Sequence, residues 1–233
     1  MNNMPTLLFN RDGSLRDFQR LVKSIYTRSG DRLFSVSDLV AQQSRFTMRA
    51  LKGIRKGDKD KLKRNLAIAF LWGMAVPNRY ELDIEDLVWK RFPQRCSYCG
   101  GKPCMCKKVK PAKRIKITYN RAERPRTLKG MQEMLGDIYP PVYRTLEHAG
   151  VHLAEEMGEI TEAVHAHMGE HKKFQLGNIK EEVADFISCI FGVANSAKID
   201  LAKEISVMFS NNCYLCHKGP CVCTISFINK LKT

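Results

Sequence analysis

Residues 181–201 read EEVADFISCIFGVANSAKIDL, and this stretch decides the fold. Its apolar middle contains one charged side chain, Asp185. A segment this apolar predicts a largely buried helix, which we place at 178–197. Glu182 lies three residues before Asp185 and therefore on the same helical face. A carboxylate buried in such a helix is costly unless it is paired or binds a cation.

A second acidic motif precedes this helix. Glu155, Glu156 and Glu159 fall in a predicted helix at 143–168, beside an apolar stripe. A solvated acidic face is the alternative interpretation, because such faces are common on helices. Two acid pairs at i, i+3 spacing, one of them within apolar sequence, favour a divalent-ion site instead. Carboxylate oxygens suit Mg²⁺ or Mn²⁺.

The cysteines form two clusters with the same spacing, C-x2-C-x4-C-x-C, and the second starts 117 residues after the first. Four thiols in eleven residues, repeated, are typical of metal sites rather than disulfides. We expect a structural zinc ion in each, about two per chain, with an iron–sulfur cluster as the alternative. The ninth cysteine, Cys189, is interpreted as a small core residue. The predicted zinc ligands are Cys96, Cys99, Cys104 and Cys106, then Cys213, Cys216, Cys221 and Cys223.

The repeat extends upstream of the cysteines. Phe18-Gln19 is matched by Met131-Gln132 at an offset of 113, and Asn78 by Asn195 at 117. The first copy lacks the acids, however. The positions equivalent to Glu155, Glu156, Glu159, Glu182 and Asp185 hold Ala41, Gln42, Arg45, Asn65 and Ile68. The chemistry is therefore expected in the second copy only.

We predict an all-α, tandem-repeat helical bundle in which a four-cysteine zinc knuckle follows each unit. Unit one is expected at 1–106, a basic linker at 107–126 and the catalytic unit at 127–233. Pro77 should kink or end the helix that contains it. The predicted helices are 14–27, 36–54, 59–79 and 83–91 in the first unit and 127–139, 143–168, 178–197 and 200–209 in the second.

Charge and hydropathy bear on partners and location. The net charge is +15, and residues 107–130 hold ten Lys or Arg against one acid, Glu123. Such a segment attracts polyanions, nucleic acid among them. The apolar run at 7–9 is followed by Asn10-Arg11-Asp12, which does not fit a secretion signal. With no apolar run long enough to span a membrane, a cytoplasmic protein without membrane contact is expected.

The sequence has E-E-x-x-E at 155–159, followed about 25 residues later by E-x-x-D at 182–185. This pair of motifs resembles that of the MazG-like branch of the all-alpha nucleoside triphosphate pyrophosphohydrolases. The segment 194–201 also resembles the family's sequence after the metal helix. The resemblance covers residues 127–210 and extends to the first copy through the scaffold only. The cysteine knuckles depart from the simplest family members.

The resemblance implies hydrolysis of an NTP or dNTP to the monophosphate and pyrophosphate. It also implies that two or more Mg²⁺ ions intervene between the acids and the triphosphate. The residues themselves make Asn195 and Lys203 candidates for base or phosphate contact, with a helix-capping or surface role as the favoured alternative. The resemblance further implies an intrachain pseudo-dimer with one active site, which could assemble into a homo-oligomer. By position, Glu156, Glu159, Glu182 and Asp185 would bind Mg²⁺, and Glu155 would bind a further ion or orient water.

Two other interpretations remain open at this point. One is a nucleic-acid-binding or adaptor protein that uses the knuckles and the basic linker. The other is a nucleotide sensor with slow turnover.

Overall fold

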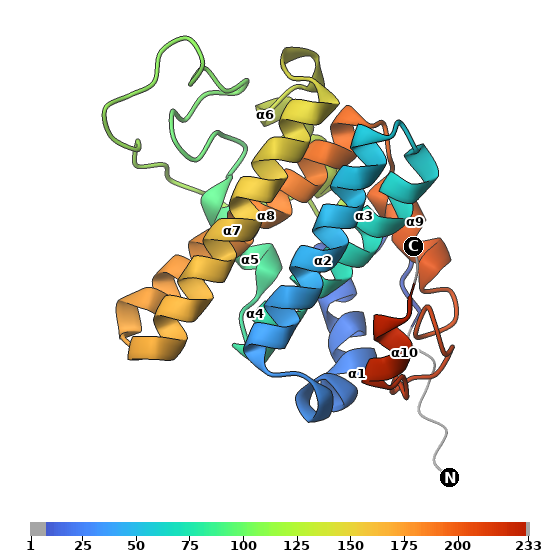
Figure 1. The fold of residues 1–233 in the computed structure, drawn as a ribbon. Helices are drawn as coiled ribbons and strands as arrows, with labels where there is room; N and C mark the ends of the chain where they lie inside the picture. Colours follow the sequence, from blue (N-terminus) through green and yellow to red (C-terminus); the bar gives the residue numbers. More distant parts are fainter. Residues whose placement is uncertain (1–7, 232–233) are drawn as a thin grey trace.

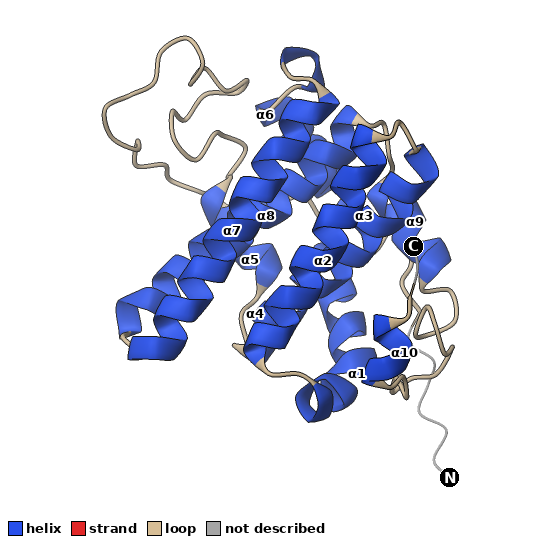
Figure 2. Cartoon of the chain, in the orientation of Figure 1, coloured by secondary structure: helices blue, strands red, loops and turns tan. Residues whose placement is uncertain are grey.

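A computed structural model describes residues 8–231, so both outer ends of the predicted units, 1–7 and 232–233, lie outside it. The described chain consists of helices and loops without strands (Figures 1 and 2), which confirms the all-α class. The helices are α1 (Leu15–Leu33), α2 (Val36–Arg55), α3 (Lys59–Gly73), α4 (Ala75–Arg79), α5 (Ile84–Arg91), η1 (Arg121–Glu123), α6 (Leu128–Ile138), η2 (Pro141–Tyr143), α7 (Leu146–Glu170), α8 (Lys173–Ser196), α9 (Leu201–Met208) and α10 (Ile225–Asn229).

Each predicted helix has a counterpart, with four main differences. Helix α8 begins at Lys173, five residues before the predicted start at 178. The helix expected at 59–79 is broken at Met74 into α3 and α4, as Pro77 predicts, because proline cannot donate to the carbonyl four residues earlier. Helix α1 continues to Leu33, six residues beyond the predicted end. Residues 224–233 were expected to form a short tail, but part of this segment is helix α10. The Thr224 side chain caps this helix by accepting from Phe227 N, and Ile228 is buried.

Local capping explains where several helices begin. At the start of α1, Ser14 Oγ accepts from Asp17 N at 3.0 Å, and Asp17 Oδ2 accepts from Ser14 N at 2.9 Å. Asp83 caps α5 and Asp200 caps α9, each through a side-chain oxygen that accepts a backbone N–H three residues later. Such capping satisfies N–H groups that have no partner within the helix.

Two helical hairpins form the centre of the molecule. Helix α2 packs along α3, α7 packs along α8, and the hairpins meet through α2 against α7 and α3 against α8 (Figure 1). Helix α5, from the first half, also packs on α8. One continuous hydrophobic core runs through both halves, with Phe70 of α3 against Phe191 of α8 at a ring-centroid distance of 5.6 Å.

A repeated hydrogen-bond pattern links the first helix of each half to the end of its buried helix. Gln132 Nε2 donates to Asn195 Oδ1 at 2.9 Å and to Ile199 O at 2.8 Å, and Gln132 Oε1 accepts from Leu201 N at 3.1 Å. The offsets of 113 and 117 residues therefore correspond to equivalent contacts. In the first half, Gln19 makes the same three bonds with Asn78 Oδ1 (3.0 Å), Leu82 O (2.6 Å) and Ile84 N (3.1 Å).

Each cysteine knuckle crosses to the opposite half. Cys104 N, in the first knuckle, donates to Ile138 O at the end of α6 at 2.7 Å. Cys221 N, in the second knuckle, donates to Ile25 O in α1 at 2.8 Å. The Tyr139 hydroxyl also donates to Cys96 Sγ at 3.5 Å. A metal ion in either knuckle would therefore fix a contact between the halves.

Candidate functional site

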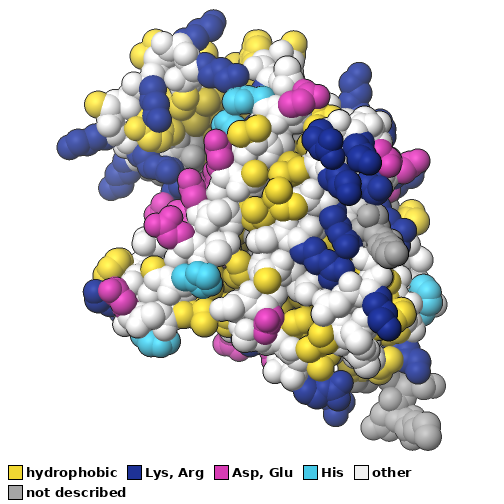
Figure 3. Space-filling view, in the orientation of Figure 1, with side chains coloured by type: hydrophobic (Ala, Val, Ile, Leu, Met, Phe, Trp, Pro, Cys, Tyr) yellow, Lys and Arg dark blue, Asp and Glu magenta, His cyan; other side chains and the backbone are white. Residues whose placement is uncertain are grey.

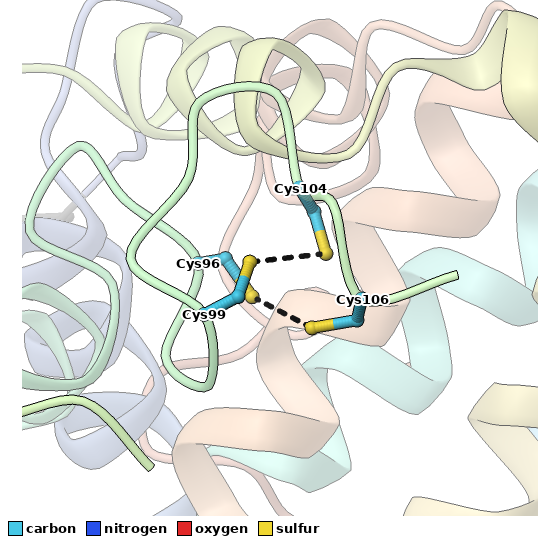
Figure 4. A group of neighbouring side chains, drawn as sticks. All are labelled: Cys96, Cys99, Cys104 and Cys106. Atoms are coloured by element: carbon cyan, nitrogen blue, oxygen red, sulfur yellow. Dashed lines mark hydrogen bonds between the residues drawn. The ribbon is translucent and has the colours of Figure 1, made fainter. Parts of the chain in front are cut away.

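The two predicted cysteine clusters each bring four thiols together. All four sulfur atoms in a cluster lie within 4.8 Å of one another, and all nine cysteines are free of disulfides. Figure 4 shows the first cluster, in which Cys96 and Cys106 approach to 3.8 Å and Cys99 and Cys104 to 3.9 Å. A tetrahedral zinc site with Zn–S bonds of about 2.3 Å places its sulfurs about 3.8 Å apart. Both clusters could hold zinc.

One thiol in each knuckle is acidic. In the first, burial opposes ionisation, but backbone hydrogen bonds from Met105 and Gly101 lower the pKa of Cys99 to about 6. In the second, the neighbouring Cys221 thiol lowers the pKa of Cys213 to about 5. Because the thiolate is the metal-binding form, each knuckle is prepared for a cation at neutral pH.

The acidic motifs converge where α7 lies against α8. Glu156 on α7 and Glu182 and Asp185 on α8 bring carboxylate oxygens within 4.8 Å of one another. Two other predicted ligands lie at the edge of this group. Glu159 is exposed but adjoins the Glu182 carboxyl group, and Glu155 is exposed on α7. The structure therefore assembles a core of three acids from the predicted set.

Burial and mutual repulsion make two of these acids hard to ionise. Burial, followed by the charges of Asp185, Glu159 and Glu182, raises the pKa of Glu156 to about 8. Burial and the Glu159 carboxyl group raise the pKa of Glu182 to about 7. Glu156 Oε2 is buried and has no hydrogen-bond partner within the described chain. A cation here would relieve both the repulsion and the missing contact.

Arg91, at the end of α5, binds the third acid. Its Nε donates to Asp185 Oδ1 at 2.9 Å, its Nη2 donates to Asp185 Oδ2, and its Nη1 donates to Glu181 Oε2 at 2.7 Å. The Arg91 and Asp185 side chains are only 13% and 14% exposed. Sequence analysis missed this residue. A signal was present, because the position equivalent to Arg91 in the second half is Met208, just as Asp185 is equivalent to Ile68.

Sequence analysis also missed a second arginine, which packs against α8. Arg144 precedes α7, and its guanidinium packs so closely on Gly192 that an added Cβ there would lie 2.5 Å from Arg144 Nη2. Its Nε is buried without a hydrogen-bond partner among the described residues, and burial lowers the pKa of Arg144. Cys189 is buried as expected; burial raises the pKa of its thiol, and the charges of Glu156 and Arg144 both act on it.

In the first half, the equivalent helix faces hold the C-terminal segment. Arg45, at the position of Glu159, donates to the carbonyls of Ile228 (3.2 Å), Asn229 (2.9 Å) and Leu231 (3.3 Å). Arg49 donates to the Leu231 carbonyl at 2.9 Å. Cations here cap the end of α10, where helix carbonyls lack partners. In the first half, the surface equivalent to the acidic site therefore contacts the C-terminal segment.

The predicted base- or phosphate-contact residues lie away from the acidic group in sequence and differ in exposure. The Asn195 amide is used within the fold, because Oδ1 accepts from Gln132 Nε2 and Nδ2 donates to Gln132 O at 3.0 Å. Lys203 is exposed on α9. Their predicted contact with substrate stays a prediction.

The basic linker is an exposed loop that projects from the bundle and carries many of the Lys and Arg side chains visible in Figure 3. Part of its charge is used internally, since Arg121 pairs with Asp86 at 3.0 Å and Arg124 with Glu85 at 3.2 Å. Lys110 Nζ lies 4.8 Å from the centroid of the Tyr98 ring. Nucleic-acid binding by the linker stays a prediction.

Two observations bear on the broader class of the protein. Within residues 8–231, no helix combines the length and apolar character that crossing a bilayer requires. No protein-family model, curated protein or solved structure gives a significant match to this chain.

Proposed function

We propose that the second half is a MazG-like active site that hydrolyses a nucleoside triphosphate, an NTP or a dNTP, to a monophosphate and pyrophosphate. The observation that carries the proposal is the convergence of Glu156, Glu182 and Asp185 in one half of a repeated scaffold. A solvated acidic face does not account for the burial of Glu156 Oε2.

The reaction that we propose balances with water alone. A water oxygen forms a bond to the α phosphorus, and the bond from that phosphorus to the α–β bridging oxygen breaks. Pyrophosphate leaves with the electron pair of the broken bond, and the water proton is released. Most of the acceleration would come from positioning and charge stabilisation.

The acids fit a divalent ion, Mg²⁺ or Mn²⁺, on chemical grounds. Hard oxygen donors from Glu156, Glu182 and Asp185 lie close together, and one buried carboxylate oxygen lacks any partner within the described chain. Glu159 and Glu155 are further candidates at the edge. When bound, such ions would polarise the α phosphate, activate water and neutralise the leaving group.

Two arginines, Arg91 and Arg144, contact α8 and differ in how their charge is used. Arg91 holds both oxygens of Asp185 and thereby orients this side chain in the site. Arg144 is half-buried, its Nε has no hydrogen-bond partner among the described residues, and it makes no ion pair with any described carboxylate, so an anionic group of the substrate would satisfy it. Arg144 is therefore a candidate contact for a polyphosphate, whereas the charge of Arg91 is already paired with Asp185 and Glu181.

The first half would then be a structural partner in an intrachain pseudo-dimer. It contributes α2 and α3 to the central packing and Arg91 to the site, while its own acid positions hold other residues. One active site per chain follows, whereas assembly of chains into a homo-oligomer stays a prediction.

The test is pyrophosphate release from a panel of canonical and modified NTPs and dNTPs, with Mg²⁺ or Mn²⁺. Wild-type protein should release pyrophosphate from at least one substrate, and Asp185→Asn should lose at least a hundredfold in rate. Asp60→Asn removes a 93% exposed acid on α3 and should have no effect. No release above background from wild type with any substrate would end the enzyme proposal in favour of a binding protein.

A further inference from the structure

A cavity of about 200 Å³ lies where α1 and the α3–α4 break of the first half meet the second knuckle. Its walls are mostly apolar and include the rings of Tyr26, Phe34 and Trp72. The Trp72 Nε1 atom is buried and is therefore not exposed at the cavity wall, so this ring adds to the apolar part of the lining.

The internal repeat relates this cavity to the place that Arg144 fills in the second half. The Arg144 side chain lies among Tyr139, Cys189, Gly192 and Cys104. In the second half, therefore, a flat guanidinium occupies this place. The residues equivalent to those four neighbours, at offsets of 113 and 117, are Tyr26, Trp72, Ala75 and Cys221, and all four line the cavity.

We propose that this cavity binds a small, flat aromatic molecule of nucleobase size, which would lie against the rings of Tyr26, Phe34 and Trp72. An apolar cavity of about 150 Å³ is large enough to hold benzene, so 200 Å³ accommodates a ring system of this kind. The rings of Tyr26 and Phe34 offer apolar contact. This site is separate from the proposed hydrolysis and does not depend on it.

The same geometry couples the site to the second knuckle. Cys213 and Cys221, which hold the knuckle together, form part of the cavity wall. Arg79 and Asp31, which pair at 2.9 Å, also line the cavity, so its lining includes charged hydrogen-bond donors and acceptors. A bound molecule would therefore contact α1, the broken helix and a knuckle at once.

Tryptophan fluorescence gives a direct test, because the chain has only two tryptophans. Trp89→Phe leaves Trp72 as the sole emitter. Adenosine, guanosine, cytidine, uridine and quinoline serve as probes, and at least one should change the Trp72 emission in a saturable manner. Ala75→Phe, which fills the cavity, should abolish this change, whereas Val207→Phe, at a position 67% exposed on α9, should preserve it.

Calorimetry on protein that retains both tryptophans covers the case in which Trp89→Phe fails to fold, since Trp89 is a fully buried core residue. The calorimetric affinity should fall at least tenfold in Ala75→Phe and stay unchanged in Glu156→Gln. Absence of saturable binding for every probe, or binding that persists in a folded Ala75→Phe protein, would overturn the inference. Neither result would bear on pyrophosphate release, so the two proposals fail separately.

Discussion

Replacing Glu156 by glutamine should stabilise the protein at pH 8 in buffer without Mg²⁺ or Mn²⁺. Burial and three neighbouring acids raise the pKa of Glu156 from an ordinary 4.5 to about 8. Between these two values the folded protein binds more protons than the unfolded chain, so its free energy of unfolding falls as the pH rises. Glutamine mimics the protonated acid and removes this dependence.

The size of the effect follows from the pKa. A rise from 4.5 to about 8 corresponds to at most about 5 kcal/mol. Glu156 is half-buried rather than fully enclosed, and solvent screening reduces the expected gain to about 2 kcal/mol. In a chain of this size, that gain raises Tm by about 4–8 °C. The gain should shrink as the pH falls towards 4.5, where glutamate is protonated in the unfolded chain as well as in the folded protein.

Thermal unfolding of zinc-loaded protein between pH 5 and pH 9 is the assay. The matched control is Glu155→Gln, an exposed acid one residue away on the same helix, which should leave Tm unchanged. Added Mg²⁺ should stabilise wild type, because an ion that binds only the folded state shifts the equilibrium, and should stabilise Glu156→Gln far less. A variant less stable than wild type at pH 8, or an equal response of both to Mg²⁺, would refute the reasoning.

Three further predictions concern the contacts around this site. Arg91→Met removes both hydrogen bonds to the Asp185 carboxylate and leaves it buried beside other acids, which should cost about 2–4 kcal/mol in urea unfolding without divalent ions. Added Mg²⁺ should restore part of this loss, and no loss would contradict the pair's role. Cys104→Ser should lower bound zinc from about two to about one per chain in elemental analysis, while Cys189→Ser keeps both. Gln132→Leu strands three hydrogen-bonding groups and should cost about 2–4 kcal/mol by the same unfolding measurement.

Local sequence predicted most of the secondary structure because helix periodicity and capping act within a few residues. Asp83 and Asp200 cap the helices that follow them, and Pro77 lies in the short helix after the break. The extension of α1, the early start of α8 and the short α10 were missed. Helix α10 has distant contacts, namely the bonds from Arg45 to its last carbonyls, and local sequence does not specify these.

The candidate site was predictable only in part. Spacing placed Glu182 and Asp185 on one helical face and Glu156 on another, and the structure brings them together. Spacing could not separate Glu156, whose carboxylate is partly buried, from its exposed neighbour Glu155. That difference depends on how α7 rotates against α8, which is set by packing across the whole interface.

By itself, the sequence determined an all-helical chain, two four-cysteine clusters and an internal repeat with acids in one half, because each of these is a local or periodic pattern. Tertiary structure alone decided that each knuckle crosses to the opposite half and that Arg91 reaches Asp185 across 94 positions of chain. It also decided that Arg144 fills in one half the place that is a cavity in the other. Such contacts depend on which side chains meet when the helices pack, and no spacing along the chain specifies that.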